Sequence, residues 1–138
     1  MARDKFHPNV IAALISDGWI ITNDPLRLQS GKIDIEIDIG AEKIIGASKD
    51  GVMIAVEVKN FLNRSPVADF EDAYGQFLLY RRILQKKEAD RHLFLAVPEF
   101  AYKTFFQRPL IQEILEDEKI DLIVFDHIQN KIVLWINW

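Results

Sequence analysis

The residues best suited to catalysis lie in the run Glu57-Val58-Lys59. Because side chains alternate along a strand, Glu57 and Lys59 point the same way, with Cβ atoms about 7 Å apart. The preceding segment carries further carboxylates at Asp38 and Glu42. Two carboxylates converging from neighbouring strands make an oxygen-rich site suited to Mg²⁺ or Mn²⁺. Such a metal polarises a phosphate and activates a bound water, and a nearby lysine orients that water or stabilises charge on phosphorus.

The alternative for this run is a role without chemistry, since Glu-x-Lys on a strand is often a solvent-facing ion pair that contributes about 0–1 kcal/mol to stability. A second pair of residues favours the functional interpretation. Gln76 and Tyr80 lie four residues apart in a segment with helical periodicity, so both side chains reach one spot. The alternative for this pair is a tyrosine packed in the core with a glutamine at its rim.

The stretch 32–47 decides which acid meets Glu57. Isoleucines at odd positions alternate with acids at even positions, which predicts one strand with an apolar face and an acidic face that includes Glu42. Lys49-Asp50-Gly51 predicts a hairpin turn. That turn would place Glu42 roughly opposite residue 58 and Asp38 beyond the end of the partner strand. We therefore expect Glu42 to be the second metal ligand, with Asp38 as the alternative.

Periodicity, glycines and prolines predict the remaining elements. In chain order they are a helix over Asp4–Asp17 with Pro8 in its first turn, a strand over Trp19–Thr22, a strand over Val52–Lys59, a helix from Ser65-Pro66 to about Glu88, a buried strand over His92–Val97, helices over 100–107 and 109–118, and a hairpin of Asp121–Asp126 with Lys131–Ile136. A helix between the third and fourth strands allows those strands to run parallel.

Length and composition limit the function classes. A chain of 138 residues with 49% hydrophobic residues fits one domain over 1–138 with a sizeable core. The formal net charge of −4 excludes a broadly polybasic binder. The absence of cysteine excludes disulfide scaffolds, Cys-ligated metals and thiol nucleophiles. The sequence shows no signal peptide and no apolar run of membrane-spanning length, so we expect a cytoplasmic protein with no membrane contact.

The element order, with an acid entering the second strand and Glu-x-Lys on the third, resembles the PD-(D/E)XK nuclease superfamily. The resemblance implies an α/β fold with a restriction-endonuclease-like core (α-β-β-β-α-β), here followed by C-terminal helices and a β-hairpin. It also implies that Glu57 and the other acid hold the metal and that Lys59 assists catalysis. Gln76 and Tyr80 match the Gln-x-x-x-Tyr motif of the RecB-like branch, which lies beside the site. One departure is that no Pro-Asp dipeptide introduces the second acid, since Asp24-Pro25 is reversed and lies elsewhere.

Many superfamily members carry a glutamate on the first helix, at a position that corresponds here to the vicinity of His7, with Asp4 one turn earlier. His7 therefore either belongs to the site, by ligating metal or contacting DNA, or is a surface residue at a helix start.

Nearly the whole chain, roughly residues 3–137, resembles a narrower family, XisH, the fdxN-element excision controlling factors of cyanobacteria. The matching runs include Asp17–Thr22, Asp38–Lys43, Ala55–Lys59 and Gly75–Phe77. The resemblance implies a role in programmed DNA rearrangement, alongside a site-specific recombinase and a small companion protein, XisI.

Basic residues for the DNA backbone would come from the positions that follow the site along the same helix. These are Arg81, Arg82, Lys86 and Lys87, with Arg91 just beyond. Each phosphate contact would make DNA binding more sensitive to salt. The alternative is an ordinary solvated helix face.

Two functions are therefore open, a metal-dependent DNA endonuclease and a catalytically inactive nuclease-fold factor that binds DNA or a partner protein. The apolar C-terminal strand, with Trp135 and Trp138, would also suit an edge covered by another chain, and a homo-oligomer is one such arrangement.

Overall fold

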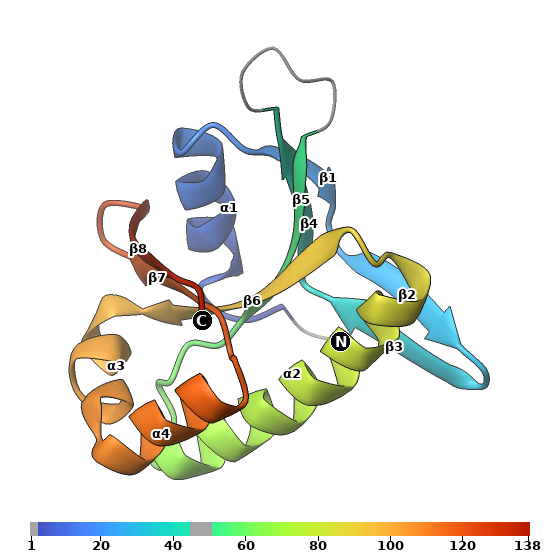
Figure 1. Cartoon of the computed structure of the whole chain (residues 1–138). Coiled ribbons are helices and arrows are strands. Elements are labelled where there is room, and N and C mark those ends of the chain that lie inside the picture. The colour runs from blue at the N-terminus through green and yellow to red at the C-terminus, as the bar shows by residue number, and fades with distance from the viewer. Residues whose placement is uncertain (1–2, 45–50) are drawn as a thin grey trace.

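The structure is a computed structural model that describes residues 3–44 and 51–138. Its centre is a six-stranded mixed sheet with strand order β1-β4-β5-β6-β7-β8 (Figure 1). The strands are β1 (Ile20–Asn23), β4 (Ile39–Lys43), β5 (Val52–Val58), β6 (Arg91–Pro98), β7 (Leu122–Asp126) and β8 (Lys131–Ile136). β5, β6 and β7 run parallel to one another and the other pairs are antiparallel. The predicted parallel pairing across the long helix is confirmed.

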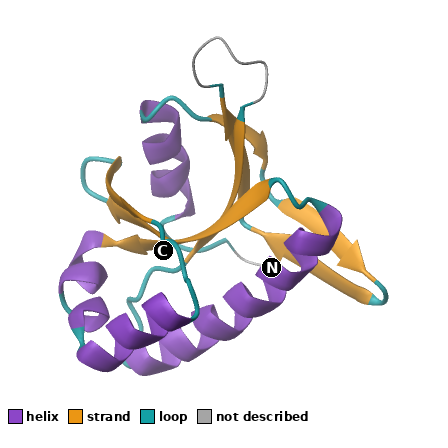
Figure 2. Cartoon of the chain, in the orientation of Figure 1, coloured by secondary structure: helices purple, strands orange, loops and turns teal. Residues whose placement is uncertain are grey.

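Helices cover the two faces of this sheet unequally (Figure 2). The longest helix, α2 (Pro66–Lys87), lies on one face with α3 (Glu99–Lys103), the 3-10 turn η1 (Phe105–Gln107) and α4 (Pro109–Asp117). The shorter α1 (His7–Ser16) covers the other face. Because side chains alternate along β6, Leu93, Leu95 and Val97 join the α2 core while Phe94 and Ala96 join the α1 core.

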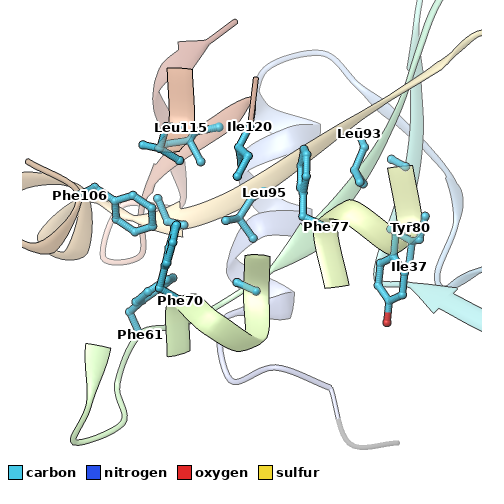
Figure 3. Close-up of a cluster of buried hydrophobic side chains, with 14 of the residues drawn as sticks. Ile37, Phe61, Phe70, Phe77, Tyr80, Leu93, Leu95, Phe106, Leu115 and Ile120 are labelled. Atoms are coloured by element: carbon cyan, nitrogen blue, oxygen red, sulfur yellow. The ribbon is translucent and has the colours of Figure 1, made fainter. Parts of the chain in front are cut away.

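Local signals account for α2. Ser65 caps its N-terminus by accepting a hydrogen bond from the Ala68 amide at 3.1 Å, and Pro66 occupies the first turn. Phe70, Phe77 and Tyr80 then face the sheet and pack with Phe106 and Leu95 in the larger core (Figure 3). This packing fixes the rotation of the helix and so decides which of its side chains face the site.

The prediction of one strand over 32–47 is wrong. The chain instead forms β3 (Ile33–Ile37), interrupts at Asp38, and continues as β4 in the main sheet. β3 pairs with β2 (Leu26–Ser30), which the sequence did not indicate, in a separate two-stranded sheet. Figure 1 shows this hairpin extending away from the main sheet.

The expected register between the second and third strands is also wrong. Ile39 pairs with Val56 and Glu42 pairs with Met53, so Asp38 lies opposite Glu57. The predicted turn at 49–51 lies outside the described residues except for Gly51.

Smaller differences concern the ends of the chain. α1 begins at His7 because the Asp4 side chain accepts the Phe6 amide in a turn that precedes the helix. The predicted helix 100–107 is divided at Thr104 into α3 and η1. β8 lies at the edge of the sheet, where Trp135 packs against Trp19 and Phe94. No helix in the described part of the chain is long and apolar enough to cross a membrane.

Candidate functional site

A pocket of about 330 Å³ opens where the N-terminal segment, the β2–β3 hairpin, the start of β4, the end of β5 and the middle of α2 meet. Six charged or polar residues predicted for the site line it: His7, Asp38, Glu57, Lys59, Gln76 and Tyr80. The remaining lining residues are Arg3, Asp4, Asp24, Pro25, Arg27, Glu36 and Val58. The fold therefore gathers at one place chemistry-bearing residues from segments that are far apart in the sequence.

Asp38 and Glu57 form the centre of the pocket. The Asp38 amide donates to Glu57 Oε1 at 3.2 Å, and the Val58 amide donates to Asp38 Oδ2 at 2.7 Å. These bonds hold the two carboxyl groups across the junction of β4 and β5. The interruption of the strand at Asp38 makes this possible, because it turns the side chain toward β5 rather than leaving it on a continuous strand face.

The Glu57 carboxyl group is difficult to ionise. Its side chain is buried, and burial is the main reason that its pKa rises from 4.5 to about 9. The negative charge of Asp38 and a hydrogen bond between the two carboxyl groups raise the pKa further, while the Asp38 amide and the Lys59 charge oppose the shift. The raised pKa favours a proton on Glu57 at neutral pH.

Lys59 lies two residues beyond Glu57 and its ammonium group reaches α2. Lys59 Nζ donates to Asp72 Oδ2 at 2.9 Å, and the Lys59 side chain is 19% exposed against 66% for Asp72. Nothing in the sequence pattern singles out Asp72. It lies one turn before Gln76, however, so that Asp72, Gln76 and Tyr80 follow one face of α2 at four-residue spacing.

Gln76 and Tyr80 both line the pocket, and the Tyr80 ring also belongs to the core (Figure 3). Both interpretations of Tyr80 therefore describe part of its role. Burial, followed by the charges of Glu57 and Asp38, raises the pKa of Tyr80 to about 12. The phenol stays protonated at ordinary pH and keeps a hydrogen-bond donor beside the two carboxyl groups.

His7 is not a surface residue, since it is 1% exposed. Its Nε2 lies 2.7 Å from Asp24 Oδ1, and its buried Nδ1 has no hydrogen-bond partner among the described residues. The Asp24-Pro25 dipeptide, which the sequence identifies only as a turn, thus holds His7 at the pocket. The same carboxylate pairs with Arg3 at 3.1 Å.

Asp4 also joins the site, as its place one turn before His7 suggested. Its carboxylate accepts the Asn60 amide at 3.1 Å and Asn60 Nδ2 at 3.0 Å, which ties the N-terminal segment to the chain just after β5. Burial is the main reason that the pKa of Asp4 is raised.

The structure does not bring Glu42 to this pocket. Glu42 lies between Ile20 of β1 and Met53 of β5, four residues along β4 from Asp38. The acid that the structure places beside Glu57 is the alternative, Asp38.

The predicted basic residues lie elsewhere on α2. Arg81 donates to the carbonyl groups of Glu118 and Lys119, at 2.8 and 2.9 Å, and so supports the end of α4. Arg82 lines a different hollow, and Lys86 and Lys87 belong to the last turn of α2. Arg91 is 7% exposed and donates to Glu88 and to the Ile54 carbonyl group, which makes it a structural residue.

The donor set suits a hydrated hard cation. Among residues 3–44 and 51–138, no cluster of three or more His, Cys, Asp or Glu side chains is arranged to hold a metal ion by itself. Mg²⁺, however, keeps several waters and commonly binds through one or two carboxylates together with substrate phosphate oxygens. Asp38 and Glu57 meet that requirement, and a cation between them would favour the ionised form of Glu57 against the burial and the Asp38 charge that raise its pKa.

Comparisons with known proteins agree with the family resemblance. A family model described as "XisH protein" matches residues 1–133. An XisH family protein from Nostoc punctiforme PCC 73102 is 41% identical, with a TM-score of 0.89 over 97% of this chain and 100% of the other. An fdxN element excision controlling factor protein from Anabaena variabilis is 44% identical, with a TM-score of 0.88 over 98% of this chain and 100% of the other. None of the curated proteins compared with the chain matches it significantly. The chain belongs to the XisH family.

Proposed function

We propose that this protein acts in the programmed excision of a DNA element as a metal-dependent DNA endonuclease of the PD-(D/E)XK type. The context comes from the family and from its Anabaena variabilis relative, which is described as an excision controlling factor. The observation that carries the catalytic proposal is the meeting of Asp38, Glu57 and Lys59 in one pocket. Asp38 directly precedes β4, Glu57 lies on β5 and Lys59 directly follows β5, so all three groups come from two adjacent strands or their ends.

The element order supports a restriction-endonuclease-like core. When the β2–β3 hairpin is treated as an insertion, the main elements follow the order α1, β1, β4, β5, α2, β6. This is the α-β-β-β-α-β order expected of that core. The last helices and β7–β8 then extend its C-terminal side.

Each residue has a role in the proposed reaction. Asp38 and Glu57 would hold Mg²⁺ or Mn²⁺, which supplies phosphate polarisation and an activated water when bound. Lys59, which forms an ion pair with Asp72, would orient that water or hold a phosphate oxygen. Tyr80 would donate a hydrogen bond, because its raised pKa keeps the phenol protonated. Gln76 would shape the pocket wall.

One observation favours a second function, that of a non-catalytic factor on a nuclease fold. Five carboxyl groups line the pocket against three cationic side chains, so the acids outnumber the cations even with Glu57 protonated, and the metal-free pocket disfavours phosphate. Such a factor would bind DNA or a partner protein without cleaving DNA. In either case we propose that it works with a site-specific recombinase and an XisI-like companion protein.

The test is a cleavage assay on supercoiled, linear and branched DNA with Mg²⁺ or Mn²⁺. Lys59→Ala and Glu57→Gln should each lower the cleavage rate by about a hundredfold or more. Glu42→Gln, on the same pair of strands but outside the pocket, should cleave like the wild type. Matched melting curves would establish that all variants are folded. Uncut DNA, or cutting that survives both pocket substitutions, would favour the non-catalytic factor.

A further inference from the structure

Two arginines at the pocket have no role in the reaction proposed above. Arg3, in the segment before α1, and Arg27, on β2, both line the pocket, and their side chains are 60% and 75% exposed. We infer that these two guanidinium groups bind DNA backbone phosphates beside the phosphate held at Lys59. The inference rests on the proposed function only in taking DNA as the substrate, and it does not require cleavage.

The two arginines are held in place but keep most of their hydrogen-bonding capacity. Arg3 Nη2 lies 3.1 Å from Asp24 Oδ1, and Arg27 Nε lies 3.1 Å from Glu36 Oε1. A guanidinium group has five N–H donors, and each of these ion pairs engages one nitrogen. Exposed pairs of this kind contribute about 0–1 kcal/mol, so a phosphate that accepts two parallel hydrogen bonds can displace or share them.

The hairpin that carries Arg27 is anchored at the pocket on both sides. Asp24-Pro25 precedes β2 and Asp38 follows β3, and all three residues line the pocket. Arg27 pairs with Glu36 and Gln29 pairs with Asp34, so polar side chains share one face of the hairpin while Leu26, Ile35 and Ile37 are buried on the other. DNA bound at the pocket would therefore run beside a polar β-ribbon that projects from the body (Figure 1).

The basic residues along α2, which the sequence suggested as contacts for the DNA backbone, are less suitable for that role than Arg3 and Arg27. Arg81 is committed to carbonyl groups at the end of α4. Arg82 follows Tyr80 by two residues, which turns it to the opposite side of the helix, and its hollow also contains Asp117 and Glu118. Lys86 and Lys87 lie about 9–10 Å beyond Tyr80 along the axis. The cations that share the pocket with Lys59 are the two arginines.

The test measures DNA binding rather than cleavage, by fluorescence anisotropy of a short labelled duplex in Ca²⁺ over a series of KCl concentrations. Arg3→Ala and Arg27→Ala should each weaken binding about tenfold, the effect of losing a charge-assisted hydrogen bond. Each should also reduce the dependence of log K on log salt by about one contact. Arg27→Lys should restore the salt dependence but not the full affinity, because lysine lacks the planar fork. Arg82→Ala is the matched control and should bind like the wild type.

The outcomes separate this inference from the proposed function. Binding by both arginine variants with wild-type affinity and salt dependence overturns the inference and leaves the nuclease proposal standing. Arginine-dependent binding by a protein that never cleaves DNA supports the inference while the endonuclease proposal fails. A wild-type protein that binds no duplex overturns both.

Discussion

Asp38 and Glu57 face each other across β4 and β5, with the Asp38 amide donating to Glu57 Oε1 at 3.2 Å. The contact joins two acids at a site where the Glu57 carboxyl group is difficult to ionise, because burial raises its pKa to about 9. A protein that needed only stability would gain nothing from such a pair, because buried like charges oppose folding. The relationship therefore makes predictions about stability as well as about function.

The first prediction is that Glu57→Gln stabilises the metal-free protein at high pH. Because the pKa of Glu57 is raised from 4.5 to about 9 on folding, the folded state holds more protons between these values, and the free energy of unfolding falls as pH rises through this window. Glutamine keeps an acceptor for the Asp38 amide and cannot ionise. We expect a gain of about 1–3 kcal/mol at pH 8 and little change near pH 4.5.

Urea denaturation in the presence of a chelator at the two pH values measures this difference. Glu42→Gln removes a carboxylate from the same pair of strands and serves as the control, with no comparable pH-dependent gain expected. Equal stability of wild type and Glu57→Gln at pH 8 would show that Glu57 is ionised in the folded protein.

His7 gives a prediction that does not depend on catalysis. His7→Ala should lower the free energy of unfolding by about 1–3 kcal/mol, because it leaves a buried cavity and removes one of the two side chains that contact Asp24 Oδ1. Ser16→Ala, at an exposed position of the same helix, should change it by less than about 0.5 kcal/mol. Thermal melting of both variants checks this, and equal melting temperatures would contradict the role given to His7.

The sequence predicts most elements here because their signals are local. Ser65 and Pro66 mark the start of α2, and the apolar run at 92–97 marks β6 with no information from the rest of the chain. The spacing within Glu57-x-Lys59 and Gln76-x-x-x-Tyr80 is also local. Once the element is correctly predicted as a strand or a helix, the spacing alone places both side chains of each pair on the same face of it.

The register could not be predicted in the same way. The alternation of isoleucine and acid continues through Asp38, so a period-two pattern cannot reveal that the chain leaves one sheet and enters another there. The register of β4 against β5 decides which acid meets Glu57, and an error of a few residues in that register exchanges Asp38 for Glu42. Arg3 and Arg27 were missed because only the tertiary path brings them to the pocket.

The corrected position of Arg81 can be tested through stability. Arg81→Ala should lower the free energy of unfolding by about 1–2 kcal/mol, because it removes two hydrogen bonds to the end of α4 and a cation–π contact with Phe77. Arg82→Ala, on the neighbouring residue, should change it by less than about 0.5 kcal/mol. Chemical denaturation followed by tryptophan fluorescence compares the two. Similar losses in both variants would mean that the α4 contact contributes nothing specific.

The final prediction concerns which acid holds the cation. Mg²⁺ should stabilise the wild type, since a ligand that binds only the folded state adds about 2.7 kcal/mol at a hundred times its Kd. Glu42→Gln should keep this response and Asp38→Asn should lose it, because Asp38 is the acid opposite Glu57. The response of the wild type should grow as pH rises toward 9, because the cation competes with the proton on Glu57.

Thermal melting with and without Mg²⁺ at two pH values measures all three responses. The reverse pattern, with Glu42→Gln insensitive to Mg²⁺ and Asp38→Asn responsive, would make Glu42 the metal ligand, as expected from the sequence. A wild type that Mg²⁺ and Mn²⁺ leave unchanged would mean that the two carboxyl groups share a proton rather than a metal. The protein would then fit the non-catalytic factor, because the acids that line the pocket would keep phosphate away from Lys59 without a cation to offset them.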